Sequence, residues 1–348
     1  MASLPVELWQ LIAEYALNDL VPFLTPPNAR PTRPRTAVLA SLSLVCKAAH
    51  LAVRDQLLAD VFVTEEEQLR LLAALLEASP QRTTLPTSLN ISWTAGSGGS
   101  TKRDGGKKWR AAVALLTRAA KGIRRFSLKG PLPFTRKKDK KEEPFWDPSW
   151  LEPASENVTD ISLSHIRITT YPQVSHVRFP KLEVLRLVQC TDGARSPKHE
   201  HFFRHFPPLR EFQLVDLTSK YQSHHLTVGF VASQAFSPSL ERLTLPALPL
   251  AEALAPQPAN SYQRVKLPPS LKHLTIIDLP YADIVHLDDV HTAVRDAVDE
   301  VTWLLSKQEP AIEYKARLFE EFFEARQMER PKIEFEELKD FYEPFPAQ

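Results

Sequence analysis

The chain has 348 residues, which is long enough for a small module and one larger domain. It holds 43 basic and 42 acidic residues, so the net charge of +1 creates no field that demands nucleic acid or an anionic membrane as partner. Only two cysteines occur, which excludes a disulfide framework and favours a reducing compartment, cytoplasmic or nuclear. No signal peptide and no transmembrane helix is indicated, because acidic residues interrupt the apolar start and no long apolar run exists.

The first predicted element is an amphipathic helix over residues 4–17, which read LPVELWQLIAEYAL. Leu4, Leu8 and Ile12 recur at a spacing that places them on one face of a helix. Pro5 suits the first turn, because its missing N–H would have no partner there in any case. The segment therefore predicts a helix with one apolar stripe.

A second helix is predicted over residues 42–54, which read LSLVCKAAHLAVR. Leu42 and Val45 share a face, and Cys46 lies beside them. The intervening residues 18–36 contain five prolines, a density that disfavours a helix across them. Periodicity alone fits two helices of an ordinary core as well as it fits a binding module.

Together these segments resemble an F-box, the short helical module that docks a protein onto the Skp-type adaptor of a cullin ubiquitin ligase. The resemblance lies in Leu-Pro-x-Glu-Leu at residues 4–8 with Ile12 after it, and in Val45-Cys46-Lys47 later. The long 18–36 segment departs from the family, as does Ala49, where the family often has Trp. The resemblance implies that the following residues face the adaptor: Leu4, Pro5, Leu8, Ile12, Leu42, Val45 and Cys46.

Helices and strands are predicted to alternate over the next part of the chain. A capping-box pattern at Thr64 opens a helix to about residue 78, and Gly122 closes a second helix that begins near residue 107. Such alternation predicts a mostly parallel sheet with helices outside it. The strands expected beside these helices cover residues 61–63, 89–93 and 125–128.

Four similar phrases follow, each with Pro two residues before Leu and then two further apolar positions. These phrases are FPKLEVLRL (179–187), FPPLREFQL (206–214), SPSLERLTL (237–245) and PPSLKHLTI (268–276). They resemble leucine-rich repeats, in which each L-x-x-L-x-L core forms one short strand of a solenoid. By that resemblance Cys190 occupies the consensus Asn or Cys position, and we interpret it as a packing residue.

The chain changes character after residue 283. Valines at helical spacing predict a helix over 288–306, another helix is expected from Pro310, and a short last one includes Leu338 and Phe341. Because a solenoid needs its open end covered, we expect a helical C-terminal cap. The alternative is a helical tail that binds a partner.

The expected fold is α/β, with an N-terminal helical F-box-like module (1–60), an irregular leucine-rich-repeat solenoid (61–283) and a helical C-terminal cap (284–348). Residues between the buried positions of each strand should face the concave side of the sheet. Their mixed charge favours a protein or peptide ligand, and no tight arginine cluster suited to a phosphorylated segment is visible. The candidate substrate-binding residues are Arg125, Arg186, Glu211, Gln213, Arg242, Thr244 and His273.

Other motifs were weighed for catalysis, metal binding and targeting. The basic run at 136–141 is read either as a nuclear import signal or as a solvated insertion, since acidic residues follow it. His201 and His205 share a helical spacing but lack the further ligands that zinc requires. No nucleophile motif or phosphate loop occurs, so we expect no enzyme activity, no cofactor and no metal.

The resemblances imply a non-catalytic substrate-recognition subunit of a Skp–cullin–F-box ubiquitin ligase. Its partners would be a Skp-type adaptor, through it a cullin, and a protein substrate held by the repeats. The alternative is a leucine-rich-repeat interaction scaffold without ligase association, whose first helices only cap the repeats. Exposure separates the two, because a docking module leaves its apolar stripe uncovered in the isolated chain, whereas a cap buries it.

Overall fold

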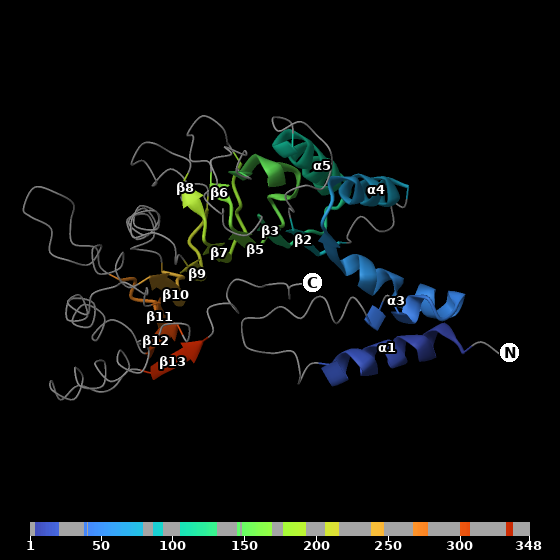
Figure 1. The fold of residues 1–348 in the computed structure, drawn as a ribbon, viewed down its shortest axis with the longest axis horizontal. Helices are drawn as coiled ribbons and strands as arrows, with labels where there is room; N and C mark the ends of the chain where they lie inside the picture. The colour runs from blue at the N-terminus through green and yellow to red at the C-terminus, as the bar shows by residue number, and fades with distance from the viewer. Residues whose placement is uncertain are drawn as a thin grey trace, which may run out of the picture.

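One long parallel sheet forms the centre of the molecule (Figure 1). The computed structural model describes residues 4–20, 38–39, 41–78, 86–92, 105–130, 145–146, 148–168, 177–192, 206–215, 238–246, 267–277, 300–306 and 332–336. The ten strands of the sheet follow one another in chain order, and every neighbouring pair is parallel. They are β1 (Asp60–Val63), β2 (Ser88–Ser92), β3 (Arg125–Lys129), β5 (Asp160–Ser164), β7 (Val184–Val188), β9 (Glu211–Val215), β10 (Arg242–Pro246), β11 (His273–Ile277), β12 (Glu300–Ser306) and β13 (Lys332–Glu336).

A second, smaller parallel sheet continues from two of these strands. It consists of β4 (Phe145–Trp146), β6 (Arg167–Ile168) and β8 (Thr191–Asp192). The chain leaves β5 through His165 and β7 through Gln189, and both residues adopt positive φ, 53° and 48°. The backbone N–H of each donates to a carbonyl of the next long strand, at 2.9 Å for His165 and 2.6 Å for Gln189. The same left-handed corner is therefore built twice, one strand apart.

Alternation of apolar and polar residues along each strand creates the core. In β9, Phe212 and Leu214 are fully buried, whereas the residues before each of them, Glu211 and Gln213, are partly exposed. Because side chains of a strand alternate between the two faces, the register carries this pattern across the sheet. One continuous apolar row runs through Leu185, Phe212, Leu243 and Leu274 on adjacent strands.

Two helices cover the apolar face near the first strands, α4 (Glu66–Glu77) and α5 (Gly105–Ala119). They lie side by side (Figure 1), and their buried side chains join the same core as the strands. Helix α4 begins with a capping box in which Glu65 and Gln68 exchange side-chain and backbone hydrogen bonds, one residue later than the sequence pattern suggested. A 3₁₀ helix over Pro148–Ala154 packs against α5. None of the described helices is long and apolar enough to cross a membrane.

The N-terminal helices α1 (Val6–Leu20) and α3 (Lys47–Ala59) pack against each other (Figure 1), and α3 contacts the first strand of the sheet. The Sγ of Cys46 accepts a hydrogen bond from the backbone N–H of Ala49 at 3.4 Å and so caps α3. Helix α3 leads directly into β1. The buried centre of the pair consists of four residues: Ala13, Leu39, Ala52 and Val53.

The predicted three-part fold is wrong, although the α/β class and the parallel pairing agree with the sequence. The structure has one long parallel sheet with few helices. Among the described residues a helical F-box-like module is not evident, since α1 and α3 share a small buried cluster of four residues. The turns between β9 and β13 lie mostly outside the described residues, so the repeating coils that define a solenoid are not shown. An open α/β sheet is the description that the structure supports.

The predicted helical C-terminal cap is also wrong where the structure describes it. Residues 300–306 and 332–336 form β12 and β13, which extend the sheet beyond β11. Valines at helical spacing indicated a helix, but Val301, Trp303 and Leu305 also alternate, which suits a strand. The open edge of β11 offers backbone partners that settle this choice in favour of the strand. The helices expected from Pro310 and around Leu338 lie outside the described residues.

Candidate functional site

An uncovered apolar surface lies on the N-terminal helices. We call it the N-terminal apolar face; its members are Leu4, Leu8, Leu11, Ile12, Leu44 and Val45, all exposed. Leu11 is 59% exposed and Leu44 is 86% exposed. Isolated apolar residues on a surface are ordinary, but six exposed apolar residues from two neighbouring segments make this face a candidate docking surface.

The packing of α1 explains why this face is turned outward. Val6 and Trp9 of α1 pack toward α3, and Ala13 is fully buried between the helices. Leu8 and Ile12 lie outside this contact on the same helix and are 44% and 38% exposed. Of the seven residues predicted to face an adaptor, Leu4, Pro5, Leu8, Ile12 and Val45 are exposed, while Leu42 and Cys46 are partly buried.

The second candidate surface is the polar face of the sheet. The register aligns one polar residue from each of eight strands in a row: Asn90, Ser127, Ser162, Arg186, Gln213, Thr244, Thr275 and Thr302. A parallel row at the strand starts carries alternating charge on several strands, including Arg125, Asp160, Glu211, Arg242 and His273. Asn90 and Ser127 are buried, so the row becomes accessible only from β5 onward.

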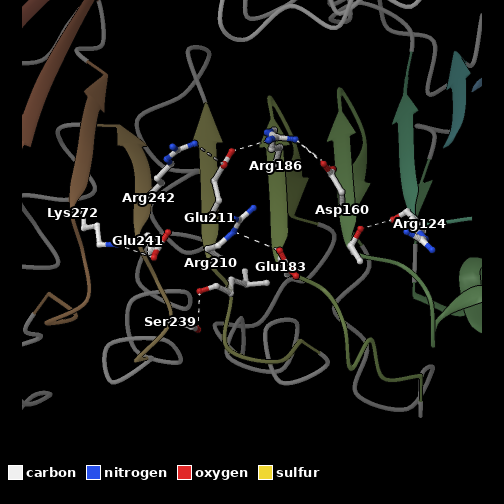
Figure 2. A network of polar contacts seen from close by, with 12 residues as sticks. Arg124, Asp160, Glu183, Arg186, Arg210, Glu211, Ser239, Glu241, Arg242 and Lys272 are labelled. Carbon is white, nitrogen blue, oxygen red and sulfur yellow. Dashed lines mark hydrogen bonds and ion pairs between the residues drawn. The ribbon is translucent and has the colours of Figure 1, made fainter. Parts of the chain in front are cut away.

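Arg186 holds two carboxylates from the strands on either side of it, as Figure 2 shows. Its guanidinium donates to Asp160 at 3.1 Å and to Glu211 at 2.8 Å. Both carboxylates are largely covered, with side-chain exposures of 14% and 20%. Burial alone would lower the pKa of Arg186, yet the charges and hydrogen bonds of the two acids raise it above its ordinary value. Arg186 is therefore occupied within the protein and joins β5, β7 and β9.

A second line of ion pairs runs one residue before the strands (Figure 2). Glu183 pairs with Arg210 at 3.5 Å, and Glu241 pairs with Lys272 at 3.0 Å. The hydrogen bond and the charge of Lys272 lower the pKa of Glu241. These side chains are well exposed, so solvent screens the pairs and each contributes little to stability.

The candidate substrate residues are only partly brought together. Gln213, Arg242, Thr244 and His273 lie on the adjacent strands β9, β10 and β11. Arg125 is separate: it lies on β3 and pairs with Asp60 of β1 at 3.2 Å. Sequence reasoning missed Thr302 because its segment was expected to be helical. Sequence reasoning also missed the ion pairs that Asp160 and Glu211 form with Arg186. The sequence does show acidic residues in the neighbouring repeats close to the position of Arg186.

Outside these two surfaces, the titratable side chains of the described residues form no cluster that could act as a catalytic site. Burial, with a smaller contribution from the charge of Lys129, lowers the pKa of His165 to about 4. Cys190 is buried and its Sγ lies 3.3 Å from the carbonyl of Leu163, which suits a packing role. Within the part of the chain that the structure describes, no three His, Cys, Asp or Glu side chains converge on a metal site. The histidines at 201 and 205 and the basic run at 136–141 lie outside that part.

Comparison with known proteins gives this chain no family: no protein-family model matches it, and neither does any curated protein. The function of this chain is therefore inferred from its own residues and from the two surfaces described above.

Proposed function

We propose that this chain is a non-catalytic substrate-recognition subunit of a Skp–cullin–F-box ubiquitin ligase, acting in the cytoplasm or nucleus. One observation carries the proposal: the N-terminal apolar face is exposed in the isolated chain. A helix pair that merely covered the end of the sheet would bury these residues, whereas a docking segment keeps them accessible. The residues that are exposed include most of those that the F-box resemblance assigns to the adaptor.

In this proposal the chain contributes position and no chemistry. The adaptor binds the N-terminal apolar face and connects the chain to a cullin, while the polar face of the sheet holds a protein substrate. Ubiquitin transfer is carried out by other subunits, which gain rate from the high local concentration of a bound substrate. The buried residues Cys190 and His165 take no part in this scheme.

Co-purification with a Skp-type adaptor tests the proposal. We expect wild type to bind and Leu8→Asp with Ile12→Asp to lower the affinity at least about 100-fold, since each apolar side chain buried at an interface contributes about 1.5–3 kcal/mol. The matched control is Leu71→Asp with Leu75→Asp, because these leucines are also exposed and four residues apart on one helix, α4. This control should bind as wild type does.

Two results would sink the proposal. One is the absence of adaptor binding by the full-length wild type, and the other is equal loss of binding in the α1 and α4 variants. Circular dichroism and thermal melting of all variants show whether a loss of binding reflects unfolding. With an intact fold and no adaptor binding, the interaction scaffold without ligase association becomes the better description.

A further inference from the structure

The polar face of the sheet carries acidic and basic side chains, and these side chains differ in how far they are exposed to solvent. The ion pair between Arg242 and Glu211 joins an exposed base to a largely covered acid. Arg210 and Glu183 are similarly exposed, and so are Lys272 and Glu241. A partner that approaches this face therefore meets the Arg242 side chain before it meets Glu211.

Arg242 is the most available of these bases. Its side chain is 66% exposed. The guanidinium Nη1 lies 4.0 Å from Oε2 of Glu211, at the limit of an ion pair. The other oxygen of Glu211 already accepts a hydrogen bond from Arg186 at 2.8 Å. The neighbouring acid Glu241 is engaged by Lys272 at 3.0 Å. In Figure 2 Arg242 lies at the end of the line that Asp160, Arg186 and Glu211 form.

The residues beside Arg242 extend its binding chemistry. The register places His273 of β11 opposite Arg242 and Thr275 opposite Thr244. His273 is exposed, and the two threonines are partly exposed. Threonine hydroxyl groups next to an exposed guanidinium supply hydrogen-bond donors for an oxyanion, with Gln213 on β9 as a further amide donor.

We propose that the surface formed by Gln213, Arg242, Thr244, His273 and Thr275 binds a glutamate- or aspartate-rich segment of a protein partner. This inference rests on the proposed function and names the class of substrate segment that the sheet would hold. Carboxylates fit better than a phosphate group, because a doubly charged phosphate is usually gripped by several converging arginines, and among the described residues of these strands Arg242 is the one arginine that is mainly exposed. Arg186 takes no part, since two carboxylates of the protein already occupy it.

Fluorescence anisotropy on the full chain tests this surface. The probe is a labelled peptide of about twelve residues that alternates glutamate and serine, compared with the same peptide carrying glutamine in place of glutamate. We expect the acidic peptide to bind more tightly and to weaken as salt rises. Arg242→Gln should lower the affinity about five-fold or more, and Arg242→Lys should retain most of it.

Charge reversal provides a gain-of-binding arm. Arg242→Glu should bind a lysine–serine peptide better than wild type does. The matched control is Arg70→Gln on α4, which removes one exposed positive charge away from the sheet surface and should leave the affinity unchanged. Arg242 is mainly solvent-exposed, so thermal melting of its variants should match wild type.

Three outcomes would overturn the inference. The first is equal affinity for the acidic and the glutamine peptide, and the second is an equal effect of Arg242→Gln and Arg70→Gln. The third is tight binding of a phosphoserine peptide or a single-stranded oligonucleotide without binding of the glutamate peptide. The peptide assay contains no adaptor, and the adaptor assay contains no peptide. A chain that binds the adaptor but not the peptide contradicts only this inference, and the reverse result contradicts only the proposed function.

Discussion

Replacing Arg186 by methionine removes the cation that holds Asp160 and Glu211. Methionine keeps much of the unbranched side-chain length but has no charge and no donors. The two carboxylates, 14% and 20% exposed, then lie unpaired on the strands that flank β7. Breaking a fully buried pair costs about 3–5 kcal/mol. Because these acids keep some contact with water, we expect Arg186→Met to lower the free energy of unfolding by about 2–4 kcal/mol at pH 7.

Urea denaturation of wild type and Arg186→Met at pH 7 measures this loss.

A triple variant supplies the control, because Arg186→Met combined with Asp160→Asn and Glu211→Gln removes the unpaired charges. We expect it to recover at least half of the stability lost by the single variant. A loss below about 0.5 kcal/mol in Arg186→Met at pH 7 would refute the reasoning, since this is the range of an ordinary surface substitution.

Two further predictions concern stability. The pKa of His165 is about 4 in the folded protein and about 6.5 unfolded, so the unfolded state gains its proton first and stability falls by roughly 3 kcal/mol as pH drops from 6.5 to 4. In thermal melts His165→Asn, which tolerates the positive φ, should lack most of that decline; an identical pH profile would contradict the assignment. Phe212→Ala, at a fully buried position of β9, should cost about 3–5 kcal/mol in urea denaturation, against less than about 1 kcal/mol for Thr244→Ala. Equal costs would mean that the apolar row is not the core.

Local sequence pattern predicted the strands where repetition reinforced it. The phrases around Leu185, Phe212, Leu243 and Leu274 each placed their strand, and aligning the phrases also aligned the polar row between the buried residues. Repetition works here because each strand buries the same face against the same kind of neighbour, so one register satisfies all of them. The parallel pairing followed from the alternation of strands and helices nearer the N-terminus.

The wrong secondary-structure prediction arose where one pattern of apolar residues fits both a helix and a strand. Val301 and Leu305 are four residues apart, which suits a helix, but Trp303 between them completes the alternation of β12. The backbone hydrogen bonds that β11 offers decide between the two, and they are invisible in the local sequence. The same limit applies to Arg186, whose availability depends on whether residues about 25 positions away in either direction occupy it.

The order of the strands determines how stability is distributed along the chain. Each long strand pairs with the strands that precede and follow it in the sequence, with the short second-sheet strands set aside. Opening β13 therefore breaks the contacts with β12 and leaves the pairing of β2 with β3 untouched. Proteins with contacts of this kind unfold in segments, each with its own free energy. The Arg186 ion pairs resist such segmental opening in the middle of the sheet, because separating β5, β7 or β9 from its neighbours exposes a charge that has lost its partner.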